Sequence, residues 1–353
     1  MNRRISKNKY LWEVGGLNAI LYKIRDRFFG GGTCEDFMQR VYEATSPEDY
    51  AGILEKRFRL LTGKDLSLEN PRTFNEKIQW IKLNGVTPLM TRLADKYLVR
   101  EWVADKIGEK ALIPLLGVWD SFDEIDFEQL PEKFVLKCNH GSGMNLAVKD
   151  RQSLNREEAR EKFGRWMATD YAVMRGYFEL QYREIPRKII AEEYIEQLDG
   201  GLADYKIHVF GGVPKIIQVI GGRDPVTHTA KEAFLDPDWN RILIRRHTYG
   251  DYEETPPKPE NLGEMLETAK KLGADFSYVR VDLYDISGGV KFGEMTFTPA
   301  SGFEPWEDEI QERFGSWIRT GSPGESGNPE NETEKERGPQ HAGPGIKEEW
   351  TAS

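Results

Sequence analysis

The chain has 353 residues, 39% of them hydrophobic and 11% aromatic, so it can bury a substantial core, and we expect two or three subdomains. Its formal net charge of −10 argues against nucleic acid as a partner, because binding to a phosphate backbone relies on a basic surface. The two cysteines lie in no zinc motif, and no apolar run approaches the roughly 18 residues that span a bilayer. We therefore expect a cytoplasmic protein.

The two ends of the chain differ from its middle. Residues 1–45 form an N-terminal extension that opens with a basic stretch, in which apolar residues from Leu11 to Phe28 recur at helical spacing. We interpret it as a helix docked on its own domain; the alternative is a peripheral contact with anionic lipid at the inner face of the membrane. Residues 319–353 are rich in Gly, Pro, Glu and Ser, a composition that predicts a disordered tail.

The first elements of the middle region are helical and then extended. Residues 73–106 have helical periodicity, and the apolar run 134–138 predicts a strand. A glycine-containing loop and a second strand over 145–149 follow, which together form a flap whose backbone N–H groups can point at phosphate oxygens. Lys137 lies within the apolar strand and is expected to reach an anion or solvent. The alternative is an ordinary hairpin.

Further elements follow in a mixed α and β order. The pattern predicts a helix over 156–174 and a strand over 188–195. A hairpin is predicted from residue 204 to residue 220, with a turn at Gly211 and Gly212. A second amphipathic helix is predicted over 261–272, just before the last hairpin.

The last hairpin brings two carboxylates together. Strands over 278–284 and 290–295 flank a turn at Ser287–Gly289, and Gly288 is equidistant from Asp282 and Glu294, so a regular hairpin pairs these two on one face. Two carboxylates about 5 Å apart repel by roughly 3 kcal/mol at an effective dielectric constant near 20. A bound Mg²⁺ would offset this repulsion, whereas the alternative is a solvated hairpin face. On this reasoning, neutralising either carboxylate should preserve or raise stability.

The order of these features resembles the ATP-grasp fold. Segments 70–80, 94–97, 204–206 and 292–297 more closely resemble the TupA-like (teichuronopeptide-biosynthesis) ATP-grasp family, and the similarity extends over about residues 50–318. The resemblance implies an α+β fold in which two α+β subdomains clamp ATP and a mainly helical domain precedes them. The implied divisions are an N-terminal domain over 46–130, subdomain A over 131–195 and subdomain B over 196–318.

The resemblance also implies roles for individual residues. Arg280 would lie near the transferring phosphoryl group, with Lys206 and Arg223 as further phosphate contacts. Asp282 and Glu294 would bind Mg²⁺; Thr296 stands where many ATP-grasp enzymes have Asn, and a neutral hydroxyl is a poorer ligand for a second Mg²⁺. The residues implied in ATP binding are Lys96, Lys137, His140, Gly141, Ser142, Gly143, Glu192, Ile195 and Asp204. For His140 the alternative is an exposed loop histidine.

The resemblance implies an ATP-dependent carboxylate–amine ligase that acts through an acyl phosphate in bacterial cell-surface polysaccharide synthesis. Its partners would be ATP, a uronate glycan as the carboxylate and an amino acid as the amine. The alternatives are a sugar kinase or glycosyltransferase of the same pathway, and an inactive nucleotide-binding scaffold. The spacing of Asp282 and Asp285 does not match a DxD motif, and the joint presence of Lys137, Arg280 and both carboxylates argues against a scaffold.

Overall fold

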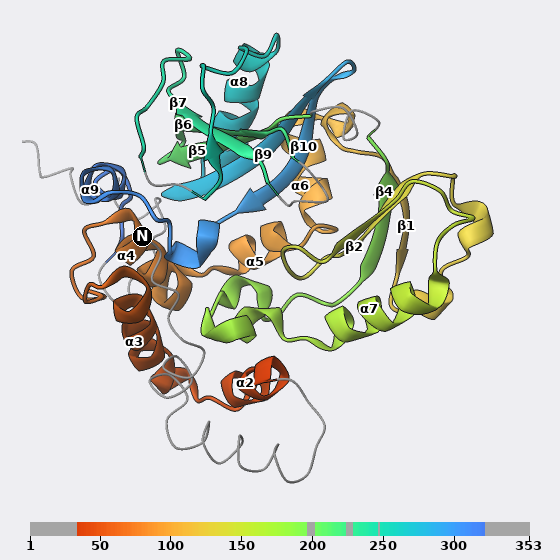
Figure 1. The fold of residues 1–353 in the computed structure, drawn as a ribbon, viewed down its shortest axis with the longest axis horizontal. Helices are drawn as coiled ribbons and strands as arrows, with labels where there is room; N and C mark the ends of the chain where they lie inside the picture. The colour runs from red at the N-terminus through yellow and green to blue at the C-terminus, as the bar shows by residue number, and fades with distance from the viewer. Residues whose placement is uncertain (1–33, 196–201, 224–228, 246–247, 322–353) are drawn as a thin grey trace, which may run out of the picture.

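The computed structural model describes residues 34–195, 202–223, 229–245 and 248–321 (Figure 1). The basic N-terminal stretch and most of the predicted tail lie outside these residues. In the described part, two separate β-sheets are surrounded by helices. The expected mixture of helices and strands is therefore confirmed.

The smaller sheet has four antiparallel strands in the order β1–β4–β2–β3. Helix α7 (Arg156–Ala168) shares a core with it, in which Phe134, Leu136 and Phe163 are fully buried. Strands β2, β3 and β4 match predicted runs. Strand β1 was not predicted: all its residues are half-buried, so it has no alternation of buried and exposed residues. The strands are β1 Leu115–Trp119, β2 Phe134–Cys138, β3 Asn145–Val148 and β4 Ile189–Glu193.

The larger sheet has six strands in the order β10–β9–β5–β6–β7–β8, antiparallel except for the β7–β8 pair. Helix α8 (Leu262–Gly273) packs on β5, β6 and β9. The predicted hairpin over 204–220 and the predicted helix over 261–272 are confirmed. The strands are β5 Asp204–Phe210, β6 Val213–Gly221, β7 Lys231–Leu235, β8 Gly250–Asp251, β9 Tyr278–Ile286 and β10 Gly289–Thr296.

The helical periodicity over 73–106 is confirmed, and the stretch divides into three α-helices. Thr73 starts the first with a capping box that includes Glu76. Thr87 caps the second, and Pro88 occupies its first position. All three share one core with the larger sheet. They are α4 Phe74–Trp80, extended by the π-helical turn η2 Ile81–Gly85, then α5 Pro88–Ala94 and α6 Val99–Ile107.

The N-terminal helices α2 (Cys34–Glu43) and α3 (Tyr50–Thr62) pack against the segment that follows α7. The helix predicted over 156–174 ends earlier, at Ala168, because Asp170 caps a separate 3-10 helix, η6 (Tyr171–Gly176). The buried side chains of this third core are Met38, Tyr42, Tyr50, Leu54, Val173 and Phe178.

The remaining helices are short. Within the described residues, none is long and apolar enough to cross a membrane. Strand β1 joins the smaller sheet although it precedes residue 131, and the domain boundaries stay a prediction. The short helices are η1 Pro47–Asp49, η3 Glu109–Ala111, η4 Phe122–Glu124, η5 Phe127–Gln129, η7 Leu180–Tyr182, η9 Pro299–Gly302 and α9 Asp308–Gly315.

Candidate active site

The two predicted metal carboxylates are partners across the β9–β10 hairpin, but the hairpin is not regular. The loop between the strands has two residues, Ser287 and Gly288, so the predicted three-residue turn is wrong. An unbroken ladder from this loop would place Glu294 opposite Val281. A bulge between Phe292 and Glu294 shifts the register by one residue and places Glu294 opposite Asp282. The predicted pairing is therefore confirmed.

Gly293 makes this bulge fit. A Cβ atom at this position would lie 3.1 Å from the carbonyl oxygen of Asp282 and 3.1 Å from the ring of Tyr284. Both contacts are tighter than ordinary van der Waals packing, so a side chain here would push β10 away from β9. The absence of a side chain thus helps to keep Glu294 beside its partner.

Asp282 is held by two cations and is only 4% exposed. The Nε and Nη2 atoms of Arg280 donate to its two carboxylate oxygens at 2.7 and 2.9 Å, and the ammonium of Lys206 also contacts it. Burial would raise the pKa of Asp282, but the charges of Arg280 and Lys206 lower it to about 2. These cations offset the repulsion between the two carboxylates, so the contacts favour a loss of stability when Asp282 is neutralised, contrary to the expectation from the sequence.

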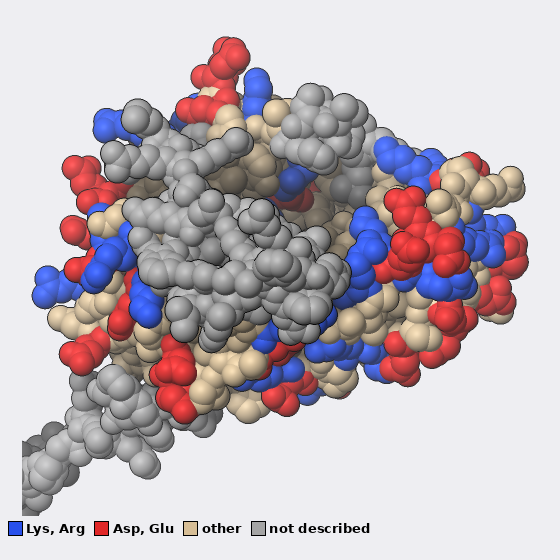
Figure 2. Space-filling model, turned by 60° about the horizontal axis from the view of Figure 1, so that its bottom comes forward, with Lys and Arg blue, Asp and Glu red and all other residues tan. Residues whose placement is uncertain are grey.

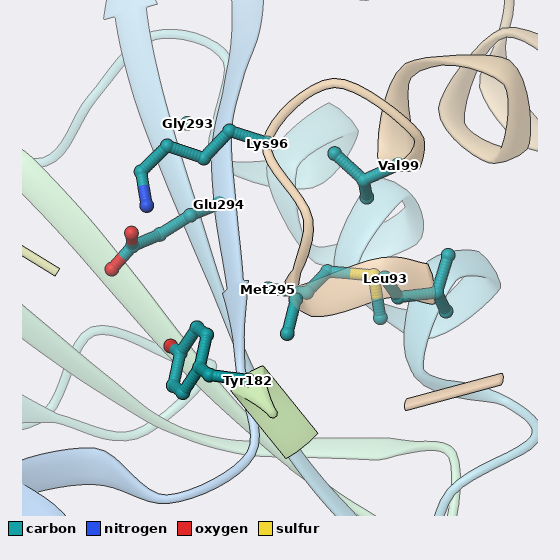
Figure 3. Close-up of a pocket in the computed structure, with 8 residues that line it drawn as sticks. Leu93, Lys96, Val99, Tyr182, Gly293, Glu294 and Met295 are labelled. Atoms are coloured by element: carbon teal, nitrogen blue, oxygen red, sulfur yellow. The ribbon is translucent and has the colours of Figure 1, made fainter. Parts of the chain in front are cut away.

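Glu294 is the more accessible of the two carboxylates. Its side chain is 32% exposed, and its Oε1 atom accepts from Arg280 at 3.3 Å and from the Thr296 hydroxyl at 3.1 Å. It lines a small pocket together with Lys96 and Tyr182 (Figure 3). In this view the Lys96 and Glu294 side chains extend in the same direction, so the ammonium and the carboxylate end close to each other.

A second charged group lies on the smaller sheet, around Glu192 in β4. This side chain is 9% exposed; its Oε1 accepts from Arg100 at 2.9 Å and its Oε2 accepts from Lys137 at 2.5 Å. The predicted role of Glu192 in binding adenine stays a prediction, and the observed role is to hold these two cations. Arg100 was not predicted, because its partner lies 92 residues away.

Lys96 connects the flap with the pocket of Glu294. Its backbone N–H donates to the carbonyl of Asn139 at 3.2 Å, and its ammonium donates to the carbonyl of Gly141. Burial lowers the pKa of Lys96, and the charge of Glu294 opposes this effect. Lys96 thus lies between the charged group of the smaller sheet and that of the larger sheet.

The flap residues divide into buried and exposed ones. His140 is 2% exposed, so the interpretation as an exposed loop histidine is wrong. Its Nε2 lies 3.2 Å from the carbonyl oxygen of Trp166, and burial lowers its pKa to about 4, so the ring is neutral near pH 7. Ser142 and Gly143 are exposed, and Gly143 has a φ of 73°. These two can approach a ligand, and their phosphate contact stays a prediction.

Gly141 is packed under an aromatic ring, since a Cβ atom there would lie 2.5 Å from the ring of Tyr171.

At the other end of the site, Asp204 opens β5 and accepts from Arg223 Nη2 at 2.6 Å. The structure thus places Arg223 beside the residue implied in ribose binding. Ile195 is half-buried, two residues after the end of β4.

The surface of the molecule is hollowed on one face, and side chains of both charges are visible inside the hollow (Figure 2). Among the described residues, no group of three or more His, Cys, Asp or Glu side chains is arranged to hold a metal ion. Asp282 and Glu294 alone still fit Mg²⁺, which commonly takes one or two carboxylates and completes its shell with phosphate oxygens and water. The Mg²⁺ site stays a prediction.

Comparison with known proteins assigns the family. A D-alanine–D-alanine ligase from Bacillus anthracis complexed with ATP is 14% identical, with a TM-score of 0.35, and the match covers 64% of this chain and 62% of that one. For the enzyme from Helicobacter pylori the values are 14%, 0.37, 71% and 70%, and for the D-cycloserine synthetase DcsG they are 18%, 0.37, 65% and 71%. No curated protein matches the chain. The model of the TupA-like ATPgrasp family matches residues 76–319, and the chain therefore belongs to this ATP-grasp family.

Proposed function

We propose that the protein is an ATP-dependent carboxylate–amine ligase that works through an acyl phosphate. Membership of the ATP-grasp family supports an ATP-dependent ligase in general. The observation that carries the proposal is the presence of two clusters of charged side chains that differ in formal charge, with Lys96 between them. We call the group of Lys96, Arg100, Lys137 and Glu192 the cationic cluster, and the group of Lys206, Arg280, Asp282 and Glu294 the carboxylate cluster.

The cationic cluster is suited to a triphosphate. Its three cations against one carboxylate leave a formal surplus of two positive charges. Lysine side chains act as flexible point charges toward phosphate oxygens. We propose that Lys96 and Lys137 contact the phosphates of ATP, that Glu192 holds Lys137 in place and that Arg100 orients Glu192. Ile195 follows β4 by two residues and Asp204 opens β5, and we expect adenine and ribose beside them.

The carboxylate cluster is suited to Mg²⁺ and to the transferring phosphoryl group. The formal charges of its two cations and two carboxylates cancel. A bound metal ion would therefore add positive charge beside the oxygens of the triphosphate. Asp282 stays ionised near neutral pH because its pKa is about 2. Arg280 presents a planar set of donors, and such a fork favours the charge that spreads over phosphoryl oxygens during transfer.

The proposed reaction has two steps. A carboxylate oxygen of the first substrate attacks the γ-phosphorus of ATP, the bond to the bridging oxygen of ADP breaks, and an acyl phosphate forms. An amine nitrogen then attacks the acyl carbon, phosphate leaves, and the nitrogen loses a proton to form the amide. Arg280 and the lysines stabilise negative charge in the first step, while Asp282 and Glu294 would hold the metal that polarises the phosphate oxygens.

The substrates belong to the proposal as well. We propose a uronic acid of a bacterial cell-surface polysaccharide as the carboxylate and an amino acid as the amine, with the reaction taking place in the cytoplasm. The partly exposed Glu294 and the exposed flap residues Ser142 and Gly143 leave one side of the site open to such a substrate.

Trapping the acyl phosphate tests this function. Uronic-acid glycans or sugar nucleotides are supplied with ATP, Mg²⁺ and hydroxylamine, which converts acyl phosphates into hydroxamates. We expect a hydroxamate that depends on ATP and Mg²⁺ and is lost in Asp282→Asn. Asp285→Asn is the matched control on the same strand, because Asp285 instead binds the side chain of Asn261. A stable phosphorylated product would indicate a kinase, and ATP binding without turnover would indicate a scaffold.

A further inference from the structure

Two buried side chains of opposite charge lie beside the turn that follows strand β10. Glu179 and Lys82 are 7% and 0% exposed, and neither was among the predicted site residues. Burial raises the pKa of Glu179 and lowers that of Lys82, so their place in the interior needs compensating contacts. Those contacts are made with the 3-10 turn η9, Pro299–Gly302.

The turn has an unusual backbone. Ala300, Ser301 and Gly302 have φ angles of 46°, 52° and 71°, so three successive residues adopt a left-handed conformation. Residues other than glycine seldom do so, and they persist there only where surrounding contacts hold them. The turn begins only three residues after Thr296, which binds both Arg280 and Glu294.

Glu179 holds both ends of this turn. One carboxylate oxygen accepts from the Thr298 hydroxyl at 2.5 Å, and the other accepts from the Ser301 hydroxyl at 2.9 Å. Lys82 donates to the carbonyl of Ser301 at 2.9 Å, and Gln181 donates to the Thr298 hydroxyl at 2.7 Å. The turn is therefore fixed by groups from two separate segments of the chain.

The segment that carries Glu179 also reaches the pocket of Glu294. Tyr182, three residues further along, lines that pocket and projects beside Glu294 (Figure 3). On its other side the segment is braced by helix α3, since Phe178 stacks on Tyr50 with ring centres 4.2 Å apart. Arg57 donates to the carbonyl of Arg175 at 2.5 Å. Helix α3 precedes the region that matches the family.

We propose that Glu179 is a positioning residue for the metal: by binding the hydroxyls of Thr298 and Ser301, it fixes the end of β10 and thus the orientation of Glu294 and Thr296. This inference rests on the proposed function, because it assumes that Glu294 binds Mg²⁺ together with ATP. Partners that orient a metal ligand without touching the metal commonly change its affinity by about 10- to 100-fold.

Under the proposal, Mg²⁺ raises the affinity of the full-length protein for a nonhydrolysable ATP analogue. The test measures the Mg²⁺ concentration at which half of this increase in affinity is reached. We expect Glu179→Gln to raise this concentration about tenfold, as for other partners of metal ligands, and to leave metal-free binding of the analogue unchanged. The matched control is Glu184→Gln, the same charge change at an exposed position of the same segment, which should leave the Mg²⁺ requirement unchanged.

A structural role is separated by a double variant. If Glu179 only balances the charge of Lys82, Glu179→Gln with Lys82→Met should restore the Mg²⁺ requirement of the unmodified protein. Under our proposal the requirement stays raised, because glutamine keeps only one of the two acceptor oxygens that bind the Thr298 and Ser301 hydroxyls. Should Glu179→Gln not fold, Ser301→Ala removes one contact and should raise the requirement by a smaller factor. An unchanged Mg²⁺ requirement in the folded variants would overturn the positioning role of Glu179 but not the metal assignment. Analogue affinity that does not depend on Mg²⁺ in the unmodified protein would overturn the metal assignment as well.

Discussion

The cationic cluster and the carboxylate cluster are built in the same way. In each, an interior strand carries a buried carboxylate that accepts hydrogen bonds from one arginine and one lysine. Glu192 in β4 binds Arg100 and Lys137, and Asp282 in β9 binds Arg280 and Lys206. Burying such groups is tolerable because each charge has a partner and its hydrogen bonds are made.

The clusters differ in the one group that is left over. In the cationic cluster the additional group is Lys96, which lies in the turn between α5 and α6, and in the carboxylate cluster it is Glu294 of β10, about a third of which is exposed. We propose that the paired charges keep each cluster stable and that the additional group decides whether the cluster attracts phosphate or metal. This separation of roles can be tested residue by residue.

The largest effect on stability is expected from Asp282→Asn. The change leaves Arg280 and Lys206 buried without their carboxylate, and removing one partner of a buried ion pair typically costs about 3–5 kcal/mol. Glu294→Gln should cost at most about 1 kcal/mol, because Glu294 is partly solvated and makes longer contacts. Urea unfolding measures both. Equal losses of unfolding free energy in the two variants would mean that Asp282 and Glu294 do not have separate roles in stability and ligand binding.

A smaller effect is expected from pH, through one buried histidine near each cluster. Burial lowers the pKa of His140 to about 4 and that of His208 to about 3. The unfolded chain therefore binds protons first as the pH falls, so the stability contributed by each neutral ring is complete above about pH 6.5 and declines below it. At pH 5 each histidine should cost about 2 kcal/mol relative to pH 7.5.

Urea unfolding at pH 7.5 and pH 5 measures this loss. His208→Gln and His140→Gln should each remove about 2 kcal/mol of the pH dependence, the contribution of one histidine. His208 lies between the hydroxyl of Tyr278, at 2.9 Å, and the side chain of Gln218, at 3.4 Å, so glutamine retains some hydrogen bonding there. A variant that kept the full pH dependence would show that its histidine is not buried in the neutral form.

Local sequence signals predicted much of the fold. The helical periodicity over 73–106, the apolar strand runs and the glycines of the hairpins each act through a few neighbouring residues. The pairing of Asp282 with Glu294 was also predicted, although the turn was taken as one residue too long and the bulge at Gly293 was missed, and these two errors cancelled. Backbone patterns can therefore give the right partners for an incomplete reason.

The partners of the charged side chains could not be predicted in the same way. Arg100 meets Glu192 across 92 residues, and Glu179 meets Thr298 across 119. A sequence shows that such groups are charged but not which of them the fold brings together. The pairing of the two carboxylates was therefore predicted, whereas the contacts of Arg280 and Lys206 with Asp282, and the cluster around Glu179, required the structure.

The central claim is that the cationic cluster binds phosphate directly and that the carboxylate cluster acts through Mg²⁺. Calorimetric titration with a nonhydrolysable ATP analogue, with and without Mg²⁺, tests it most directly in Lys137→Met and Glu294→Gln. We expect Lys137→Met to weaken binding about tenfold in both conditions, equivalent to about 1.4 kcal/mol. Glu294→Gln should leave metal-free binding unchanged and abolish the gain that Mg²⁺ provides. Loss of metal-free binding in Glu294→Gln, or unchanged affinity in Lys137→Met, would contradict the account.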